Sequence, residues 1–514
     1  MNTFASCGRQ PIRITGPTFF VIVMWAALLR AATVTPSDAV VTYVVVRALP
    51  STKSAKIGKF SPRDRAEVLE AVPKWKKVKL ANGLVGYVSA KWVTEAEPIS
   101  LKRSSTEPIS VTGVTGPMPL LTTGHPVTWW FVFKFNSAKF PSCGPGATPE
   151  CSFGGQVQSY TASNPPASSQ QFVYASSESP ALQQGAGCVG DNDADPVGAT
   201  FGQIYNGSFH YVVWNDQFYN SPPIVGCPKF CDAPWGHSKG IIAWNDDAEG
   251  LLMQVTTPSW PAAGSYALPR QNDGNTLGCT HNNNLKFSQH FFALRLNHGD
   301  LVKVLKSLQT ASVATDPAKL QIVSNGGPQD VQDLVTSLGA QSETTVATIM
   351  TLSTGVELIS KPSALHVPPW QMVSALLGGI PLRVATWWSE SKINSTTFDT
   401  PIGCWNAALG RPGPVEIATS GQWNGISFGL TGGISSGDHN HAKIGVSKSG
   451  SHHYAIFGDM NQEGALTESN PGGCATQQNG QGGLFFVIDN PALASSIGDL
   501  INGATAATAT AATD

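Results

Sequence analysis

The sequence predicts a mixed α/β protein built from two halves that share one active site, preceded by a small all-β unit. Two observations predict the halves. A His-x-Lys triplet occurs at residues 237–239 and again at 441–443, and the spacing of apolar residues between the triplets alternates between helical and strand periods. Short β-favouring runs separated by turn residues over 41–97 predict the small unit. A chain of 514 residues is long enough to bury the cores of several domains.

Residues 1–32 have the pattern of a secretory signal peptide. Arg9 and Arg13 precede an apolar run over 19–29, and two alanines follow it. The run is shorter than the roughly 20 residues that a membrane-spanning helix needs. An uncleaved membrane anchor is the alternative, and no other stretch is long and apolar enough to span a bilayer. We therefore expect a secreted or periplasmic protein that has no integral membrane span after signal cleavage.

The nine cysteines agree with export. Cys7 lies in the predicted signal peptide, and the remaining eight permit up to four disulfides whose pairing the sequence does not determine. Cys227 and Cys231 are spaced closely enough to suggest zinc, but no second Cys or His pair with metal-ligand spacing accompanies them. The sequence therefore predicts neither a bound metal nor another cofactor.

Residues 41–97 form a basic unit. They contain eleven Lys and Arg against five Asp and Glu, a balance of +6, whereas residues 98–514 contain eighteen against twenty-eight, a balance of −10. A basic surface attracts polyanions, although a merely solvated basic face is the alternative. The run Asn82-Gly83-Leu84-Val85-Gly86-Tyr87-Val88 and the runs around it resemble a bacterial SH3-type domain. The resemblance implies a small SH3-like barrel and a cell-envelope polymer as a partner.

A linker and then a larger domain follow the basic unit. The linker, 98–124, is rich in Ser, Thr, Pro and Gly. Beyond it, the apolar patterns predict strands at 127–135, 211–214, 291–296, 319–323, 382–388 and 485–488, and helices at 300–308, 329–338, 369–377 and from Pro491 onward. The Ala- and Thr-rich end of the chain, 498–514, is predicted to be disordered.

Each triplet is followed by an apolar run, a polar turn and a second apolar run, which predicts two β-hairpins. In a strand, residues i and i+2 project from the same face, so His237 would lie beside Lys239, and His441 beside Lys443. Lysine can neutralise phosphodiester oxygens, a neutral histidine can attack phosphorus, and a protonated histidine can supply a proton to the leaving oxygen. Structural histidines and surface lysines are the alternative interpretation.

The two motif segments resemble the signature motifs of the deoxyribonuclease II family, a branch of the phospholipase D superfamily. The segments are Gly236-His237-Ser238-Lys239-Gly240-Ile241 and His441-Ala442-Lys443-Ile444-Gly445-Val446-Ser447. Further landmarks occur in the family's order at 126–134, 214–217, 287–291, 458–461 and 482–486. The resemblance covers 125–497. It implies a duplicated phospholipase D-like α-β-α sandwich with a pseudo-two-fold active site, in halves of about 125–310 and 311–497.

Departures from the wider superfamily pattern favour the deoxyribonuclease II branch. The superfamily has an Asp five residues after the Lys, where this chain has Trp244 and Lys448, and the branch also lacks that Asp. The family tends to have an Asn where the first half has Ser259. The resemblance implies that four residues are catalytic and that four others support them or contact substrate. The first group is His237, Lys239, His441 and Lys443, and the second is Asn461, Gln289, His290 and Ser259.

The predicted activity is hydrolysis of DNA by a metal-independent acid endonuclease with little sequence preference. His237 would attack phosphorus to form a phosphohistidine, His441 would protonate the leaving 5′ oxygen, and water would release a 3′-phosphate. Because one histidine must be charged, the optimum should lie near or below the ordinary histidine pKa of about 6.5. All eleven histidines follow residue 97, so their protonation would shift residues 98–514 from −10 to +1 and remove repulsion toward DNA.

Two other functions stay open from the sequence. Another phosphodiesterase of the superfamily would act on RNA or lipid. An inactive envelope-binding or toxin-like protein would keep the nuclease fold without turnover. The sequence also leaves the oligomeric state open, a homodimer included.

Overall fold

The computed structural model describes the chain between residues 33 and 509, with gaps. The described residues are 33–37, 40, 43–61, 66–80, 84–95, 116–141, 143, 153, 171–190, 194–227, 229–269, 286–433, 436–469 and 472–509. They belong to two compact units, one within 1–111 and one within 112–514. The predicted signal peptide, 1–32, lies outside the described residues.

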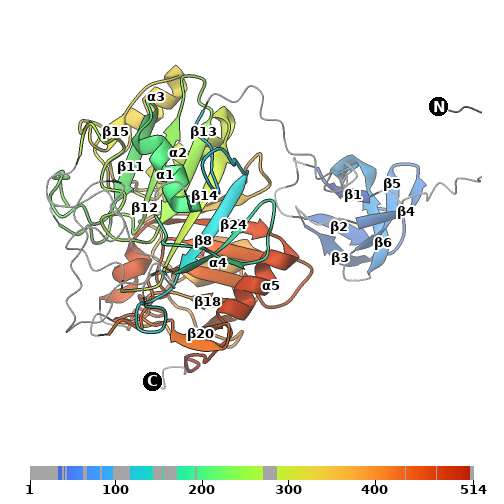
Figure 1. Ribbon diagram of the computed structural model, residues 1–514. Helices are drawn as coiled ribbons and strands as arrows, with labels where there is room; N and C mark the ends of the chain where they lie inside the picture. Colours follow the sequence, from blue (N-terminus) through green and yellow to red (C-terminus); the bar gives the residue numbers. More distant parts are fainter. Residues whose placement is uncertain are drawn as a thin grey trace, which may run out of the picture. The chain divides into compact units, whose positions relative to one another are not determined.

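The first unit is a seven-stranded antiparallel sheet with the order β3-β2-β6-β5-β4-β1-β7 (Figure 1). Its elements are β1 (Thr33–Pro36), β2 (Val44–Arg47), β3 (Lys56–Phe60), β4 (Ala66–Val72), β5 (Trp75–Leu80), β6 (Val85–Ser89), η1 (Ala90–Trp92) and β7 (Val93–Glu95). The sheet starts at residue 33 rather than at the predicted residue 41. The reason is that Val34 is fully buried in the core of the unit while β1 pairs with β4 and β7.

The second unit contains two large mixed-length sheets and five helices among its described residues. The first sheet has the order β10-β9-β8-β14-β13-β12-β11-β15. Its strands are β8 (Trp129–Lys134), β9 (Phe172–Ser176), β10 (Gln183–Gln184), β11 (His210–Asn215), β12 (Lys239–Trp244), β13 (Gly250–Val255), β14 (Gln289–Leu296) and β15 (Val323–Ser324).

The second sheet has the order β16-β17-β24-β23-β22-β18-β19. Its strands are β16 (Thr348–Thr351), β17 (Glu357–Lys361), β18 (Leu382–Ala385), β19 (Val415–Ile417), β22 (Ile444–Ser447), β23 (Tyr454–Gly458) and β24 (Gly483–Asp489), and β20 (Ser420–Trp423) and β21 (Ile426–Gly429) form a separate hairpin. The helices are α1 (Pro196–Tyr205), α2 (His298–Thr310), α3 (Gln329–Thr336), α4 (Pro369–Leu376) and α5 (Pro491–Leu500), with short 3-10 turns η2 (Ala407–Leu409), η3 (Gly473–Ala475) and η4 (Gln477–Gly480).

The two large sheets repeat one topology. The order β8-β14-β13-β12-β11 in the first corresponds to β17-β24-β23-β22-β18 in the second, and every neighbouring pair is antiparallel. Helix α1 precedes β11 as α4 precedes β18, and α2 follows β14 as α5 follows β24. Strands β12 and β22, which begin at the ends of the two His-x-Lys triplets, are therefore equivalent.

The two sheets pack against each other through aromatic rings. Phe131 of β8 stacks on Phe457 of β23 with ring centroids 4.3 Å apart. Phe292 of β14 lies 4.9 Å from Phe457 and 5.3 Å from Phe486 of β24. Strands β8, β12 and β13 are buried along their whole length, as expected of strands covered on both faces. This packing places equivalent strands of the two halves close to one another.

Most elements predicted for the large domain are confirmed, and one strand prediction is wrong. The four predicted helices correspond to α2, α3, α4 and α5, and both predicted hairpins form as β12–β13 and β22–β23. Residues 319–323 instead form a hydrogen-bonded turn, in which the amides of Ile322 and Val323 donate to the carbonyl of Lys319. Only Val323 and Ser324 belong to a strand, β15, because Leu320 points outward and is 65% exposed.

The ends of the predicted linker and tail are ordered where they are described. Leu120, inside the predicted linker, bridges to Pro126 and its amide donates to Thr200 Oγ1 over 2.9 Å. The predicted disordered tail begins inside α5, and Thr505 and Thr508 bridge to Ala418 and Ser395. The segment is held at the edge of the second sheet by main-chain hydrogen bonds, from the amide of Ala506 to the carbonyl of Ile417 and from the amide of Thr419 to the carbonyl of Ala504. Residues 96–115 and 510–514 lie outside the described residues.

Three disulfides are present among the described cysteines. They join Cys143 to Cys188, Cys227 to Cys231 and Cys404 to Cys474. The close pair at 227 and 231, considered above as a metal site, is thus a disulfide. Cys151 and Cys279 lie outside the described residues. Over the described ranges, none of the helices has both the length and the apolar composition that a bilayer crossing requires.

Candidate active site

The first triplet lies where the chain enters the first sheet, in contact with the second half. The amide of His237 donates to the carbonyl of Gly482 over 2.8 Å, and Gly236 forms a parallel bridge with Gly482. Strand β12 then begins at Lys239, which pairs with Asn215 at the end of β11. The sequence predicted both triplets within strands, but His237 lies just before β12, and His441 and Lys443 both lie just before β22. His237 therefore lies where the two halves of the domain meet.

The second triplet repeats this arrangement in reverse. The amide of His441 donates to the carbonyl of Ser288 over 2.7 Å, and Asn440 forms a parallel bridge with Ser288. Ser288 precedes β14 as Gly482 precedes β24, so the two acceptors are equivalent. Each half thus holds the histidine of the other, and the two triplets meet at one site.

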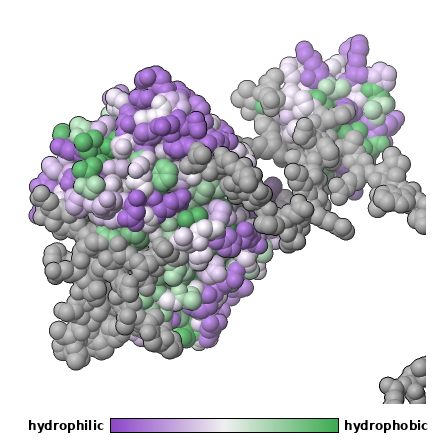
Figure 2. Space-filling model, turned by 45° about the horizontal axis from the view of Figure 1, so that its top comes forward, coloured by the Kyte–Doolittle hydropathy of each residue, from purple (hydrophilic) through white to green (hydrophobic). Residues whose placement is uncertain are grey.

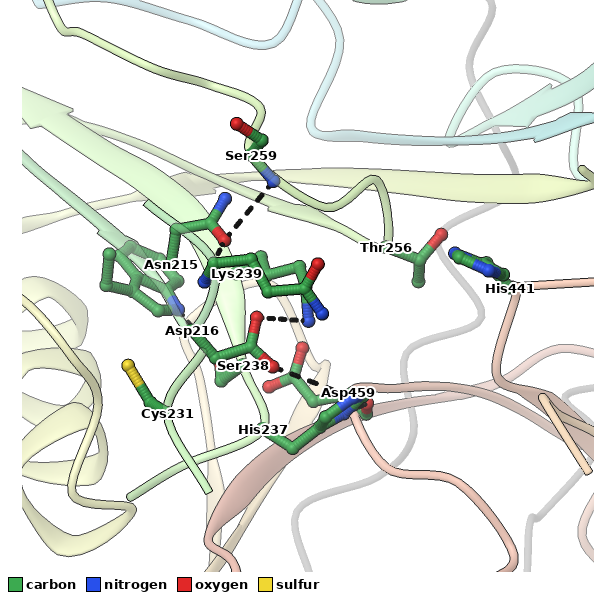
Figure 3. A network of polar contacts seen from close by, with 12 residues as sticks. Asn215, Asp216, Cys231, His237, Ser238, Lys239, Thr256, Ser259, His441 and Asp459 are labelled. Atoms are coloured by element: carbon green, nitrogen blue, oxygen red, sulfur yellow. Dashed lines mark hydrogen bonds and ion pairs between the residues drawn. The ribbon is translucent and has the colours of Figure 1, made fainter. Parts of the chain in front are cut away.

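A buried carboxylate lies against the first triplet. Asp216 Oδ1 is 2.6 Å from Lys239 Nζ, and Asp216 Oδ2 is 3.6 Å from His237 Nε2 (Figure 3). The side chains of Lys239 and Asp216 are 3% and 4% exposed, whereas that of His237 is 14% exposed. Burial raises the pKa of Asp216, and the neighbouring Lys239 opposes that change. Of the three groups, the imidazole is the one that solvent reaches most.

The orientation of His237 is fixed by the second half. Its Nδ1 lies 2.8 Å from the carbonyl oxygen of Asp459, which can only accept, so Nδ1 carries the proton and Nε2 has the free lone pair. The carboxylate of Asp459 is itself held by Gln254 Nε2 and the amide of Leu484, each over 2.9 Å. Burial raises the pKa of Asp459 to about 7. Both halves therefore contribute to the positioning of one imidazole (Figure 3).

His441 lies in an aromatic environment instead. Its ring stacks on Phe287 with centroids 4.9 Å apart and an interplanar angle of 6°, and the ring of Trp387 lies edge-on at 4.6 Å. Within the described part of the chain, its ring nitrogens make no hydrogen bond. Lys443 Nζ donates to the carbonyl of His441 over 2.6 Å. The second histidine is thus held by packing rather than by polar partners.

Burial and neighbouring positive charge lower the pKa values of His237, His441 and Lys443. Burial lowers the pKa of His237 well below its ordinary value, and the charges of Lys239 and Lys443 lower it further. The pKa of His441 is also well below its ordinary value because of burial, then Lys443 and Lys239. Burial lowers the pKa of Lys443 to about 7, with Lys239 adding to the effect. These mutual influences place both triplets in one electrostatic environment.

The four residues expected to support the site are buried around it. Gln289 and His290 are fully buried, and His290 Nδ1 accepts a hydrogen bond from the amide of Lys443 over 3.1 Å. Asn461 is 6% exposed and its Nδ2 donates to Glu463 Oε2 over 3.0 Å. Ser259 is 2% exposed, and its amide lies 3.4 Å from Asn215 Oδ1. The roles that the resemblance implies for these four residues, support of the site or contact with substrate, stay predictions.

Sequence reasoning missed the three acidic residues of the site. Asp216 and Asp459 lie in stretches that carried the family resemblance, but nothing in a single sequence shows which strand ends meet. Glu463 accepts hydrogen bonds from the amides of Ser389 and Glu390, and burial raises its pKa. The sequence offered one signal, which was position. Asp216 follows a predicted strand shortly before the first triplet hairpin, and Asp459 and Glu463 follow the second triplet hairpin.

Two family models match this chain. The model described as Deoxyribonuclease II matches residues 119–502, about three quarters of the chain, and the model described as Bacterial SH3 domain matches residues 42–94. The chain belongs to the deoxyribonuclease II family. No curated protein matches the sequence significantly.

This member of the deoxyribonuclease II family is a deoxyribonuclease-type hydrolase with a bacterial SH3 domain at its N-terminal side. The family match covers both sheets and both triplets. The SH3 match covers β2 to β6 and η1, and it ends within β7. The two imidazoles and two ammonium groups described above therefore lie in the region that the deoxyribonuclease II model matches.

Proposed function

We propose that the chain is a secreted or periplasmic acid endonuclease that hydrolyses DNA without a metal ion, forms a phosphohistidine intermediate and leaves 3′-phosphate ends. The proposal rests on the two reciprocal hydrogen bonds between the halves. Because His237 is held by Gly482 and His441 by Ser288, both imidazoles are directed to one place between the sheets. Two imidazoles and two lysines in one site are the groups that an in-line displacement at phosphorus requires.

In the first step, His237 Nε2 attacks phosphorus and the bond to the 5′ oxygen breaks. The Nδ1 proton, held by the carbonyl of Asp459, keeps the Nε2 lone pair available. His441 gives its proton to the departing 5′ oxygen. Asp216, 3.6 Å from Nε2, stabilises the positive charge that the ring acquires on phosphorylation.

In the second step, water attacks the phosphorus and gives a proton to His441. The bond between phosphorus and nitrogen breaks, which restores His237 and releases the 3′-phosphate. Lys239 and Lys443 supply the positive charge that the non-bridging oxygens need in the transition state, in place of a metal ion. Asn461, next to Glu463, supports the same oxygens.

The proposed fold is a duplicated phospholipase D-like sandwich. The repeated strand order and the equivalent placement of α1 with α4 and of α2 with α5 support this assignment. Three disulfides are compatible with an oxidising, extracytoplasmic location. A cell-envelope polymer, bound through the SH3 domain, is the proposed second partner of the chain beside DNA, since bacterial SH3 domains often bind the envelope.

Plasmid cleavage by the purified mature protein tests the proposal. At mildly acidic pH in excess EDTA, the wild type is expected to nick and degrade the plasmid, and both His237→Ala and His441→Ala are expected to lose this activity. His452→Ala is the matched control, because His452 is an exposed histidine paired with Asp489 outside the site.

Three outcomes would contradict the proposal. Activity that EDTA abolishes and Mg²⁺ restores would show that a metal supplies the charge assigned to the lysines. Ends carrying a 5′-phosphate would place the broken bond on the other side of phosphorus. Cleavage restricted to RNA would show that the 2′-hydroxyl takes part, contrary to attack by His237.

A further inference from the structure

A row of cationic and aromatic side chains crosses four strands of the SH3 domain. Lys56 of β3 pairs with Arg47 of β2, Arg47 pairs with Tyr87 of β6, and Tyr87 pairs with Lys77 of β5. Directly paired residues on neighbouring strands project from the same face of a sheet. These four residues, the basic row, therefore lie side by side. With strands about 4.8 Å apart, the row is about 14 Å long.

The basic row lies on the outer face of the sheet. Along β6 and β5, burial alternates, and the neighbours Val88 and Val78 are fully buried in the core of the unit. Tyr87 and Lys77 therefore point away from the core. A bulge after Val46 shifts the register so that Lys56 faces Arg47. The bulge thus brings the exposed Lys56 of β3 beside Arg47 of β2.

Aromatic rings accompany the cations of this domain. Lys77 Nζ lies 5.9 Å from the ring centroid of Tyr87, and Lys59 Nζ lies 4.6 Å from that of Tyr43, which is 41% exposed. Figure 2 shows hydrophilic residues with hydrophobic ones between them on the visible surface of this domain. Cations interleaved with exposed rings suit a nucleic acid, because cations neutralise phosphates and rings stack on bases.

We propose that the basic row binds the DNA substrate and holds it for the catalytic unit. The proposal rests on the proposed function for the identity of the polymer. Residues 98–514 carry a balance of −10 at neutral pH and repel DNA, whereas residues 41–97 carry +6. Attachment of a DNA-binding domain to the same chain raises the local concentration of substrate at the active site. The density of positive charge favours a polyphosphate over an uncharged envelope polymer.

The test measures DNA binding by the full chain in which His237→Ala and His441→Ala prevent cleavage. Anisotropy of a labelled duplex is recorded at pH 7 over a range of salt. Adding Lys56→Gln and Lys77→Gln is expected to weaken binding and to reduce the slope of log K against log salt by about 2, at about 0.9 per phosphate contact. The control pair, Lys53→Gln and Lys91→Gln, removes the same charge from a turn and from η1, both outside the row, and is expected to leave the slope unchanged. Thermal unfolding confirms that each variant is folded.

Equal losses in the two pairs would overturn the proposal, because they would mean a diffuse charge effect. An unchanged DNA slope together with lost binding to purified cell wall in Lys56→Gln/Lys77→Gln would also overturn it, in favour of an envelope polymer. Failure of the proposed function would appear in a different experiment, the plasmid cleavage assay. In the active protein, the row variants are expected to raise KM for long DNA and to leave turnover of a nucleoside 3′-(4-nitrophenyl phosphate) unchanged.

Discussion

The two triplet histidines occupy equivalent places but have different neighbours. In the first half, Asp216 follows the residue that pairs with Lys239. In the second half, the pairing of β18 with β22 can be continued by one residue, to Lys443. Trp387 is then the equivalent of Asp216, and its ring packs on His441. A carboxylate favours a ring that becomes positive on phosphorylation, whereas an aromatic enclosure favours a weakly basic ring that gives up its proton readily. The asymmetry supports His237 as nucleophile and His441 as acid.

A change of leaving group separates these roles. A 4-nitrophenolate leaves without a proton, so a nucleoside 3′-(4-nitrophenyl phosphate) does not need the acid in the first step. His441→Ala is expected to retain release of nitrophenolate in a single turnover while it loses cleavage of DNA, and His237→Ala is expected to lose both. The reverse pattern would exchange the two assignments.

Asp216 is expected to act as a positioning residue. Asp216→Asn removes the charged partner of Lys239 and the carboxylate beside His237. A hydrogen bond to a charged group contributes about 1.5–3 kcal/mol, so kcat is expected to fall by roughly 10- to 100-fold. Single-turnover cleavage gives the rate, and thermal unfolding gives the stability. KM is expected to change less than kcat. A wild-type rate in a folded Asp216→Asn protein would show that Asp216 has no positioning role in the site.

Equivalent strands also end in equivalent lysines. Lys134 of β8 pairs with Gln289, and Lys361 of β17 pairs with Gly483, next to the two carbonyl acceptors that hold the histidines. Both lysines are fully buried, and burial lowers the pKa of each well below its ordinary value. Lys361 Nζ donates to the carbonyl oxygens of Pro362, Leu365, Asn479 and Gln481. The ammonium group therefore ties the segment before β24 to the end of β17.

Removal of this tie is expected to destabilise the second half. Lys361→Met keeps most of the side-chain volume but leaves buried carbonyl groups without a donor, at about 1–3 kcal/mol for each. The free energy of unfolding is expected to fall by about 3 kcal/mol or more, measured by urea unfolding with Lys306→Met, at an exposed position of α2, as a surface control. An unchanged midpoint would mean that water replaces the ammonium group at no cost.

Sequence patterns predicted elements well where one periodicity dominates. The helices at 300–308 and 329–338 and the strands around 127–135 and 485–488 follow directly from apolar spacing, and the two triplets indicated the site. The short apolar run at 319–323 failed because a local turn competes with a strand of that length. Asp216 and Asp459 were missed because their roles depend on which strand ends meet across the sheets, and the tail was missed because small residues pack without an apolar signal.

At the scale of the whole molecule, charge is divided between the units and changes with pH. Below a pH of about 7, Lys443 is charged and Asp459 is protonated, whereas above it Lys443 loses its charge and Asp459 becomes an anion. The site therefore becomes less favourable for phosphate as pH rises. Protonation of the eleven histidines at acid pH makes the net charge of residues 98–514 more positive, which also favours phosphate.

The pH profile of DNA cleavage is expected to be bell-shaped with an acidic optimum. Because the pKa of His441 lies well below its ordinary value, the fraction of protonated acid falls as pH rises, and it does so at a lower pH than for an ordinary histidine. A bound phosphate raises that pKa, so the alkaline limb of kcat should lie at higher pH than the limb of kcat/KM. Rates at constant ionic strength from about pH 4 to pH 9 bracket the ordinary histidine pKa and check this. A flat profile, or an optimum above neutrality, would contradict it.

The reciprocal bonds from His237 to Gly482 and from His441 to Ser288 also bear on ancestry. A polypeptide with a single half would have one histidine and one acceptor carbonyl, each facing an absent counterpart. Such a polypeptide could complete the site only by pairing with another copy of itself, and its activity would vary with concentration. Joining two such halves in one chain removes that dependence. It also allows the two equivalent positions to carry different residues, Asp216 in one half and Trp387 in the other.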